Sequence, residues 1–279
     1  MTAISGTISG ALSGLGMRIR LGRLAVLRCP RLTIDSTRHQ PLTLASLVLP
    51  DPAGEVGRTL TRGDAAEIQL GYRDQTPATW RGTVGGVMAG PSKDQVLVRV
   101  LGPELLLVET LISQTWLDES PEAIVRAAVR QAGLPLRRID SPGMMLRHFV
   151  ASGVAPWQLA RQAAHTVQRA TGQDMRRWAL WMDASGAVNW GDFEEPGDEA
   201  GSVPAIATRA GLIRHEPASG PAALSRVETF LLPSMRHSRL FRLRDERRSI
   251  DEQIRALRVV HEITPGSART HLFYGDEHE

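Results

Sequence analysis

Cysteine and lysine each occur once in the 279 residues, and each scarcity excludes a kind of structure. With Cys29 alone, no intrachain disulfide can form, and the mostly apolar stretch LAVLRCPRL favours a buried, inert thiol over a reactive one. Lys93 does not follow a glycine-rich strand and turn, so the sequence holds no phosphate-binding loop. The nucleophile-elbow motif G-x-S-x-G is also absent.

Long apolar runs are lacking as well. The N-terminal run MTAISGTISGALSGLG has no basic residue before Arg18 and is shorter than the roughly 20 residues that span a bilayer. Each of its repeated glycines would cost a helix about 1 kcal/mol relative to alanine. We expect residues 1–17 to form a flexible or partner-ordered arm. We also expect the free protein to be synthesised and folded in the cytoplasm without a membrane partner.

An excess of one charge sign is missing too. Basic residues number 33 and acidic residues 30, and all the basic residues except Lys93 are arginine. The densest basic run includes Asp245 and Glu246 and is followed by Asp251 and Glu252; its arginines are Arg236, Arg239, Arg242, Arg244, Arg247 and Arg248. This alternation of sign predicts ion pairs within the chain or between subunits, for which guanidinium groups are well suited. An arginine-rich nucleic-acid-binding barrel stays open as an alternative.

Residue types that carry catalysis or bind metals are present without the spacing that those functions need. The eight histidines form no H-x-H or H-E-x-x-H motif. His261 and His271 could face one another across a hairpin, where an exposed cross-strand pair is favoured over a metal site. Asp192, Glu194 and Glu195 lie in the glycine-rich stretch 191–204, which favours solvated loop charges over a rigid glycosidase pair. The sequence predicts no catalytic residue, no cofactor and no metal, with a cell-wall-degrading enzyme as an alternative.

Period-two patterns predict strands between residues 18 and 101. Ile68, Leu70 and Tyr72 alternate with more polar residues, and the run 95–101 is apolar enough on both sides to be well buried. Residues 61–64, 72–77 and 89–94 supply glycine, proline and aspartate for turns, and Asp64 is expected to be a turn residue before a strand. Several short strands without a helical pattern indicate a small barrel or sandwich.

The period changes to that of a helix at Ser120. Ser120 is a good N-cap, Pro121 suits the first helical position, and Gly133 can end the helix in the left-handed conformation. A second helix is predicted from near Pro156 to Gly172, with one apolar face.

A β-hairpin is predicted directly after the second helix. Two short alternating segments flank residues 184–186, and Gly186 can take the positive φ of the turn. Trp178 and Trp181 fall on opposite faces of the first strand, so they do not form a joint platform for stacking bases. Packing in the core or at a subunit interface is favoured instead.

The pattern of the C-terminal third leaves two structures open. Residues 239–260 fit either an arginine-rich helix, with Ile250, Ile254 and Leu257 at helical spacing, or a strand. Pro265-Gly266 between two alternating segments favours a hairpin over residues 256–275, and a short helix near 247–255 stays open.

Three segments of the sequence follow one another in an informative order. The first is Leu60-Thr61-Arg62-Gly63-Asp64 with IQLGY and then Trp80-Arg81-Gly82-Thr83-Val84. The second is TWLDESPEAIVRAAVRQAGL, residues 115–134, and the third is VASGVAPWQLARQAA, residues 150–164, followed by WALWMDASGAVNWGDF. In this order they resemble the baseplate-hub proteins of phage tails, a family that includes late-control proteins of contractile phages and the related part of type VI secretion spikes. The similarity covers residues 18–195 in order and 225–275 more loosely.

The resemblance implies an α+β, mainly β chain with two small β-barrel-like domains joined by α/β segments that hold two main helices. The implied segments are an arm (1–17), a first barrel (18–114), an α/β middle (115–195) and a second barrel-like part (196–279). Hubs of this family assemble as trimers whose six barrels form a ring of near-sixfold symmetry between the hexameric tail tube and the trimeric spike.

The resemblance also predicts what the chain contacts and where it acts. The expected partners are two further copies of the chain, the tail tube protein, the spike or tail-tip protein and other baseplate proteins. The expected location is the baseplate of a virion tail. DNA would pass through the lumen without tight binding. Because the sequence shows no lysozyme or spike segment, we expect no catalytic module of the family to carry over to it.

Overall fold

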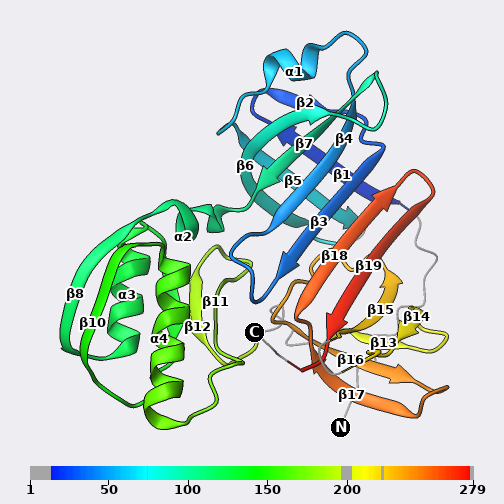
Figure 1. Cartoon of the computed structure of the whole chain (residues 1–279). Helices are drawn as coiled ribbons and strands as arrows, with labels where there is room; N and C mark the ends of the chain where they lie inside the picture. Colours follow the sequence, from blue (N-terminus) through cyan, green and yellow to red (C-terminus); the bar gives the residue numbers. More distant parts are fainter. Residues whose placement is uncertain (1–13, 74, 196–202, 221–222, 277–279) are drawn as a thin grey trace. The chain divides into compact units, whose positions relative to one another are not determined.

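The computed structural model describes residues 14–73, 75–195, 203–220 and 223–276. The chain divides into two compact units, whose elements are labelled in Figure 1. Of the described residues, the strand-rich unit holds those in 14–36, 43–102 and 194–276, and the helical unit holds 37–42 and 103–193. Strands hold 49% of the chain and helices 15%, so the predicted α+β, mainly β class is confirmed.

The strand-rich unit contains most of the strands. Its elements before the helical unit are β1 (Leu15–Leu21), β2 (Leu24–Val26), β3 (Arg31–Thr37), β4 (Leu44–Pro50), α1 (Glu55–Thr59), β5 (Ala65–Tyr72), β6 (Ala78–Ala89) and β7 (Gln95–Leu101). Its elements after the helical unit are β13 (Ala205–Ala207), β14 (Leu212–Glu216), β15 (Ser225–Phe230), β16 (Leu240–Asp245), β17 (Ile250–Arg255), β18 (Arg258–Thr264) and β19 (Ser267–Tyr274).

These strands form open sheets, whereas the sequence predicted barrels. Eleven strands lie in the order β14-β15-β19-β18-β3-β4-β7-β6-β5-β1-β2, and a second sheet has the order β13-β16-β17. Both sheets have end strands, so the predicted closure into barrels is not observed among the described residues. Of the predicted N-terminal arm, residues 1–13 lie outside the described residues and residues 15–17 already belong to β1. The domain boundaries at residues 17, 114 and 195 stay predictions.

The pairing of β3 with β18 joins the two halves of the eleven-stranded sheet, and the two strands lie side by side in Figure 1. Two ion pairs connect these strands at opposite ends. Arg31 Nη2 lies 2.7 Å from Glu262 Oε1, and Arg258 Nε donates to Asp35 Oδ1 at 2.9 Å. Because the first residue of each strand contacts a late residue of the other, the two strands run antiparallel.

Period-two burial explains why these segments are strands. In β5, Ala66, Ile68 and Leu70 are buried while the residues between them are partly exposed, as the sequence predicted. In β7, Val98 and Val100 are buried but Leu97 is only half-buried. Asp64 is a turn residue before β5, where its Oδ2 accepts a hydrogen bond from the Thr61 backbone N–H at 2.9 Å.

The C-terminal third is built from strands, so the alternative helices at 239–260 and 247–255 are wrong. β16 pairs antiparallel with β17, with Phe241 opposite Ile254 and Arg244 opposite Asp251. Phe241 and Leu243 are buried while Arg242 and Arg244 are exposed, which is the period of a strand. The hairpin predicted over residues 256–275 is confirmed, because β18 and β19 pair from Thr264–Ser267 outward around Pro265-Gly266.

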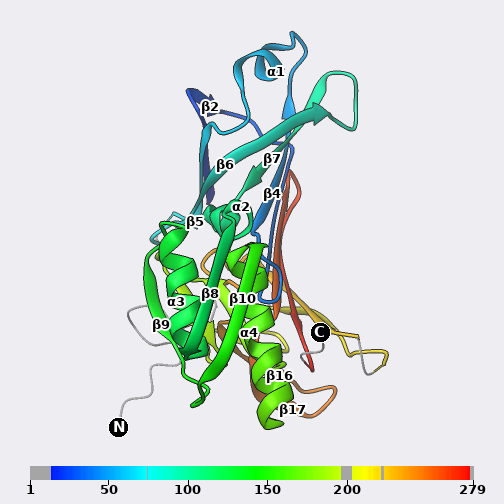
Figure 2. The ribbon, with the colours of Figure 1, turned by 60° about the vertical axis from the view of Figure 1, so that its left-hand side comes forward.

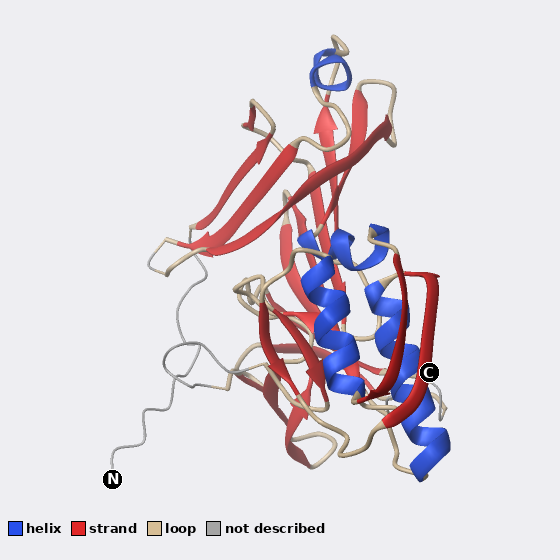
Figure 3. Ribbon diagram, turned by 90° about the vertical axis from the view of Figure 1, so that its left-hand side faces the viewer, coloured by secondary structure: helices blue, strands red, loops and turns tan. Residues whose placement is uncertain are grey.

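The helical unit has three layers. Its elements are η1 (Pro103–Leu105), α2 (Leu106–Glu109), β8 (Ile112–Glu119), α3 (Pro121–Gln131), β9 (Leu136–Ile139), β10 (Leu146–Val154), α4 (Pro156–Thr171), β11 (Ala179–Met182) and β12 (Val188–Gly191). Helices α3 and α4 lie between the two-stranded β8–β10 sheet and the three-stranded β11-β12-β9 sheet (Figure 3). Figure 2 shows β8 and β10 running side by side along one face of the helices.

The two main helices have the ends that the sequence predicted. Ser120 Oγ accepts a hydrogen bond from the Ala123 N–H at 3.3 Å, with Pro121 in the first turn of α3, and Gly133 has φ +70°. Helix α4 begins at Pro156 and ends at Gly172, whose φ is +75°.

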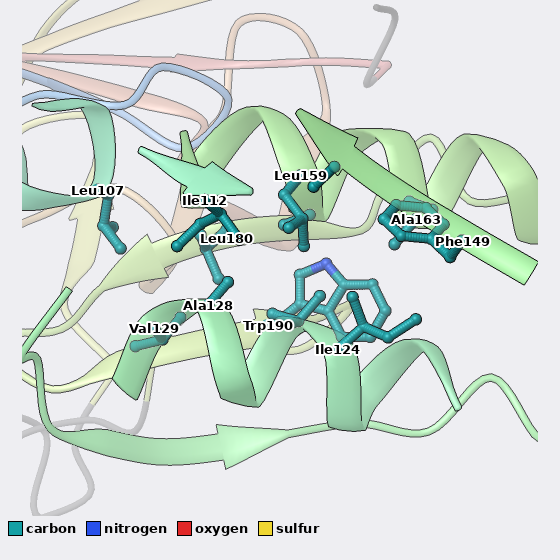
Figure 4. Close-up of a cluster of buried hydrophobic side chains, with 14 of the residues drawn as sticks. Leu107, Ile112, Ile124, Ala128, Val129, Phe149, Leu159, Ala163, Leu180 and Trp190 are labelled. Carbon is teal, nitrogen blue, oxygen red and sulfur yellow. The ribbon is translucent and has the colours of Figure 1, made fainter. Parts of the chain in front are cut away.

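The core of the helical unit surrounds one indole ring. The Trp190 side chain of β12 lies between the two helices, with Ile124 of α3 and Leu159 of α4 on either side (Figure 4). Trp178 contacts the same ring edge-on, with ring centroids 5.0 Å apart. An aromatic ring of this size buries a large apolar area, so it fixes the spacing of the layers.

The predicted hairpin after α4 is confirmed as β11–β12. Gly186 has φ +84°, and Asp183 Oδ1 accepts hydrogen bonds from the backbone N–H groups of Ser185 and Ala187. Burial raises the pKa of Asp183, but these bonds and those from the Ser185 hydroxyl and Asn189 outweigh burial and lower it. Among the described helices, none is long and apolar enough to cross a membrane.

His261 is a neutral, fully buried group at the join of the eleven-stranded sheet. Its Nε2 lies 2.9 Å from the Met235 carbonyl oxygen, which can only accept, so Nε2 carries the proton and Nδ1 accepts from Thr270 Oγ1. Burial lowers its pKa from 6.5 to about 4, and the positive charges of Arg236 and a protonated His271 act in the same direction.

We predict that stability falls as the pH drops from 6.5 to about 4. In this range the unfolded chain binds a proton at His261 that the folded chain does not bind, so the depressed pKa leaves stability unchanged above pH 6.5 and lowers it below. The expected loss is about 3 kcal/mol at the acid end of the window. Urea unfolding between pH 7 and pH 4.5 measures it. His261→Gln should show a shallower pH slope, whereas the exposed His148→Gln should keep the wild-type slope; equal slopes for both variants would contradict the prediction.

Candidate assembly surfaces

Several arginines of the arginine-rich run of β16 and the turn after it pair with carboxylates of the same chain. Arg242 donates to both carboxylate oxygens of Asp251, at 2.7 and 3.0 Å, and Arg244 Nε lies 3.4 Å from the same carboxylate. The hydrogen bond from Arg242 lowers the pKa of Asp251. Arg248 lies 3.0 Å from Asp245. The predicted pairing of alternating charges is therefore confirmed within the chain. Each of these arginines already contacts a carboxylate, through two hydrogen bonds or by sharing it with another arginine, which leaves it less available to bind phosphate.

The acidic stretch 191–204 differs from its prediction at Glu195. The Glu195 side chain is only 4% exposed, and its Oε2 accepts a hydrogen bond from Arg239 Nε at 3.1 Å. Glu194 is more exposed and lies 3.6 Å from Arg255. Residues 196–202 lie outside the described residues. Glu195 is thus a buried, paired carboxylate and not a solvated loop charge, because the segment ending at Glu195 pairs through its backbone with Ser238.

The two histidines of the β18–β19 hairpin do not face one another. His261 lies opposite Thr270 and His271 opposite Val260, so the rings point to opposite faces of the sheet. Both are buried, and His271 Nδ1 accepts from Arg226 at 3.0 Å. Within the described ranges, no group of three His, Cys, Asp or Glu side chains could hold a metal ion.

Trp178 and Trp181 belong to separate clusters, as the sequence predicted. Trp178 packs against the Trp190 cluster, whereas Trp181 contacts Phe193, with ring centroids 5.7 Å apart. Cys29 is half-buried, and burial raises the pKa of its thiol to about 11, so the thiol stays protonated at neutral pH.

A fully buried arginine that the sequence did not single out holds the helical unit together. Arg38 is 0% exposed, and it donates to the backbone carbonyls of Arg177, Gly191 and Phe193 at 2.9–3.2 Å. Its guanidinium lies over the Trp181 ring. A single arginine in a polar turn sequence carries no local signal of burial, so only the tertiary structure reveals it.

The outer face of the β8–β10 ribbon is an exposed apolar surface. The inner face packs Trp116 against Phe149, whose ring centroids are 5.9 Å apart. On the outer face, Leu117 is 68% and Val150 51% exposed, and the register places them diagonally on neighbouring strands. Two further exposed side chains, Leu111 and Met145, lie at opposite ends of the ribbon.

Both strands of the ribbon pair with no strand except one another, so each has an unpaired backbone edge in the described structure. Exposed apolar side chains together with free strand edges are typical of surfaces that contact other proteins. The sequence contained the motif TWLDES at this place but did not indicate that Leu117 would be exposed.

The described residues define a mainly β, α+β chain, and the solved structures with a similar fold include tail proteins. A 43 kDa tail protein of prophage MuSo2 from Shewanella oneidensis aligns with a TM-score of 0.68 at 9% identity, over 94% of this chain and 96% of that one. A tail protein from Neisseria meningitidis MC58 aligns with a TM-score of 0.64 at 12% identity, over 94% and 96%.

A third structure belongs to the type VI secretion system of E. coli and is described as structurally similar to the T4 bacteriophage tail proteins gp27 and gp5. It aligns with a TM-score of 0.60 at 9% identity, over 94% of this chain and 79% of that one. No protein-family model matches the sequence, and no curated protein matches it. The resemblance to baseplate-hub proteins is therefore confirmed at the level of the fold.

We predict that the buried Glu195–Arg239 pair contributes far more to stability than the exposed Arg242–Asp251 pair. Glu195→Ala leaves the guanidinium of Arg239, 12% exposed, without this carboxylate and should lower the free energy of unfolding by about 3 kcal/mol. Asp251→Ala removes a carboxylate that is 49% exposed and should leave the urea midpoint nearly unchanged. Equal shifts of the two midpoints would show that burial does not set the strength of these pairs.

Proposed function

We propose that this chain is a structural baseplate hub of a phage or phage-like tail and turns over no substrate. The observation that carries this proposal is the alignment of nearly the whole chain, 94% of it, with tail proteins that are themselves almost completely covered. The alignment with a type VI secretion component supports a hub in particular, because that protein is described as similar to gp27 and gp5.

In this proposal the chain forms a trimeric ring of near-sixfold symmetry. The strand-rich unit supports it, because it holds two separate apolar cores. The larger core includes Ile19, Leu47 and Trp80, and the smaller one includes Phe241 and Val259. Two β modules in each of three chains would offer six modules to a hexameric tube, while three chains match a trimeric spike.

The proposed partners are two further copies of the chain, the tail tube protein, the spike or tail-tip protein and other baseplate proteins. The proposed location is the baseplate of the virion tail, with DNA passing through the lumen without tight binding. The ribbon face of β8 and β10 is the proposed contact with another copy. Leu117 and Val150 are its apolar centre, and apolar centres of interfaces exclude water.

We predict a trimer in solution. Size-exclusion chromatography with light scattering should give a mass of three 30.5-kDa chains, alone or together with the tube or spike protein. A chain that stays monomeric and binds neither partner at high concentration would refute the hub assignment.

We further predict that Leu117→Asp combined with Val150→Asp dissociates the trimer. Each change puts a carboxylate into the apolar centre of the contact, and the expected effect is at least a roughly tenfold rise in the dissociation constant. Circular dichroism shows whether the monomer is still folded, which the exposure of both side chains leads us to expect. Arg126→Gln, on the exposed face of α3, is the control and should leave the trimer intact. A trimer that survives the double change places the contact elsewhere on the chain.

A further inference from the structure

A cavity of about 550 Å³ lies in the strand-rich unit between two turns. One turn, residues 208–211, connects β13 to β14, and the other, residues 246–249, connects β16 to β17. The volume is within the range of small-ligand sites in proteins. Its charged lining consists of Arg209, Arg214, Arg247, Arg248, Asp245 and Glu246.

The charges of this cavity are unbalanced. Four guanidinium groups face two carboxylates, and Glu216 beside Arg214 reduces the formal excess to one positive charge. Arg248 pairs with Asp245, and Arg214 pairs with Glu216 outside the lining. Within the described part of the chain, Arg209 and Arg247 have no carboxylate partner. The exposed arginines of β16, Arg242 and Arg244, by contrast share the carboxylate of Asp251.

The floor of the cavity is rigid and its hydrogen bonds are satisfied. His215 Nδ1 lies 2.8 Å from Asp245 Oδ2, and His215 Nε2 lies 2.8 Å from the Tyr274 hydroxyl. Both side chains of the His215–Asp245 pair are at most 2% exposed. Because Asp245 is already held by His215, by Arg248 and by the Arg247 backbone N–H, it is not available to pair with Arg209.

The two turns that carry the arginines are tied together and strained. Thr208 N–H donates to the Arg244 carbonyl at 2.9 Å, and the Glu246 N–H donates to Thr208 Oγ1 at 3.1 Å. Arg209 has φ +67° and Ser249 has φ +54°, in the left-handed region that non-glycine residues seldom adopt. Strain of this kind persists where the surrounding structure imposes it, and it is frequent at ligand clamps.

We propose that this cavity binds a compact dianion of phosphate chemistry, either inorganic phosphate or the terminal phosphate of an organic monoester. Guanidinium forks match the oxygens of phosphate in a bidentate manner. A phosphate monoester carries about two negative charges at neutral pH, which the two lining arginines without a carboxylate partner, Arg209 and Arg247, can offset. A single carboxylate or one phosphodiester would offset only one of these two arginines. This proposal does not depend on the assembly role.

Isothermal titration calorimetry on the full chain tests it, with inorganic phosphate and glucose 6-phosphate as separate titrants at low salt. We expect saturable binding of one anion per chain. Binding of glucose 6-phosphate alone would identify a phosphate monoester as the ligand. Equal binding of both titrants would show that the phosphate group alone is sufficient for binding. Arg209→Asn and Arg247→Gln should each weaken binding about tenfold, because each removes a charge-assisted contact.

Three controls keep the test decisive. Arg244→Gln removes an exposed arginine of the same strand that is outside the lining, and it should change the affinity by less than about twofold. Asparagine tolerates positive φ, so Arg209→Asn should keep or raise the unfolding midpoint while it loses the ligand. No binding of either anion at millimolar concentration, or equal losses in Arg244→Gln and Arg209→Asn, overturns the proposal. Tighter binding of duplex DNA or of a hexaglutamate peptide than of phosphate, abolished by Arg209→Asn, overturns it in favour of that ligand.

Discussion

The pairing of β3 with β18 is the constraint on which the strand-rich unit depends. Its two ion pairs join residues that are 231 and 223 positions apart in the sequence, so their formation closes nearly the whole chain into a loop. The entropy cost of such a closure grows only slowly with loop length, and the burial of apolar side chains on both strands offsets it. Leu32 and Ile34 of β3 and Val259 of β18 are fully buried. Without this pairing, the strands before and after the helical unit would form two separate sheets with two more exposed edges.

The same join explains why polar groups are buried there. The Arg236 guanidinium lies 3.6 Å from the centroid of the Trp80 ring and donates to the Thr79 carbonyl, while Trp80 also contacts the edge of His261. These contacts connect a strand of the N-terminal half to the C-terminal half. Buried polar groups cost free energy unless their partners are in place, so they penalise alternative registers of the join. A symmetric assembly of identical chains would need every copy to have the same register in this pairing, because each copy must present the same surface.

The distribution of charge separates two kinds of surface. Arginines on β16 contact a carboxylate of the same chain, whereas the ribbon of β8 and β10 exposes the apolar side chains of Leu117 and Val150. An assembly protein must keep its contact surface open and its remaining charges balanced to stay in solution before it meets its partners. In the arginine-lined cavity between the turns of residues 208–211 and 246–249, Arg209 and Arg247 have no carboxylate partner among the described residues.

Local patterns in the sequence determined the helix ends and turns, which depend on interactions between residues close in the sequence. Ser120, Gly133 and Gly172 set the ends of the helices, and Pro265-Gly266 set the last hairpin, because caps and turns depend on neighbouring residues alone. Only the tertiary structure decided that residues 250–255 form a strand, that Glu195 and Arg38 are buried, and that the sheet stays open instead of closing into barrels. Helical and strand periods overlap in short segments, and the burial of a charge depends on a partner that is distant in sequence. For that reason the order of motifs was enough to predict that this chain shares the fold of tail proteins. The partners of the arginines could be identified only from the structure.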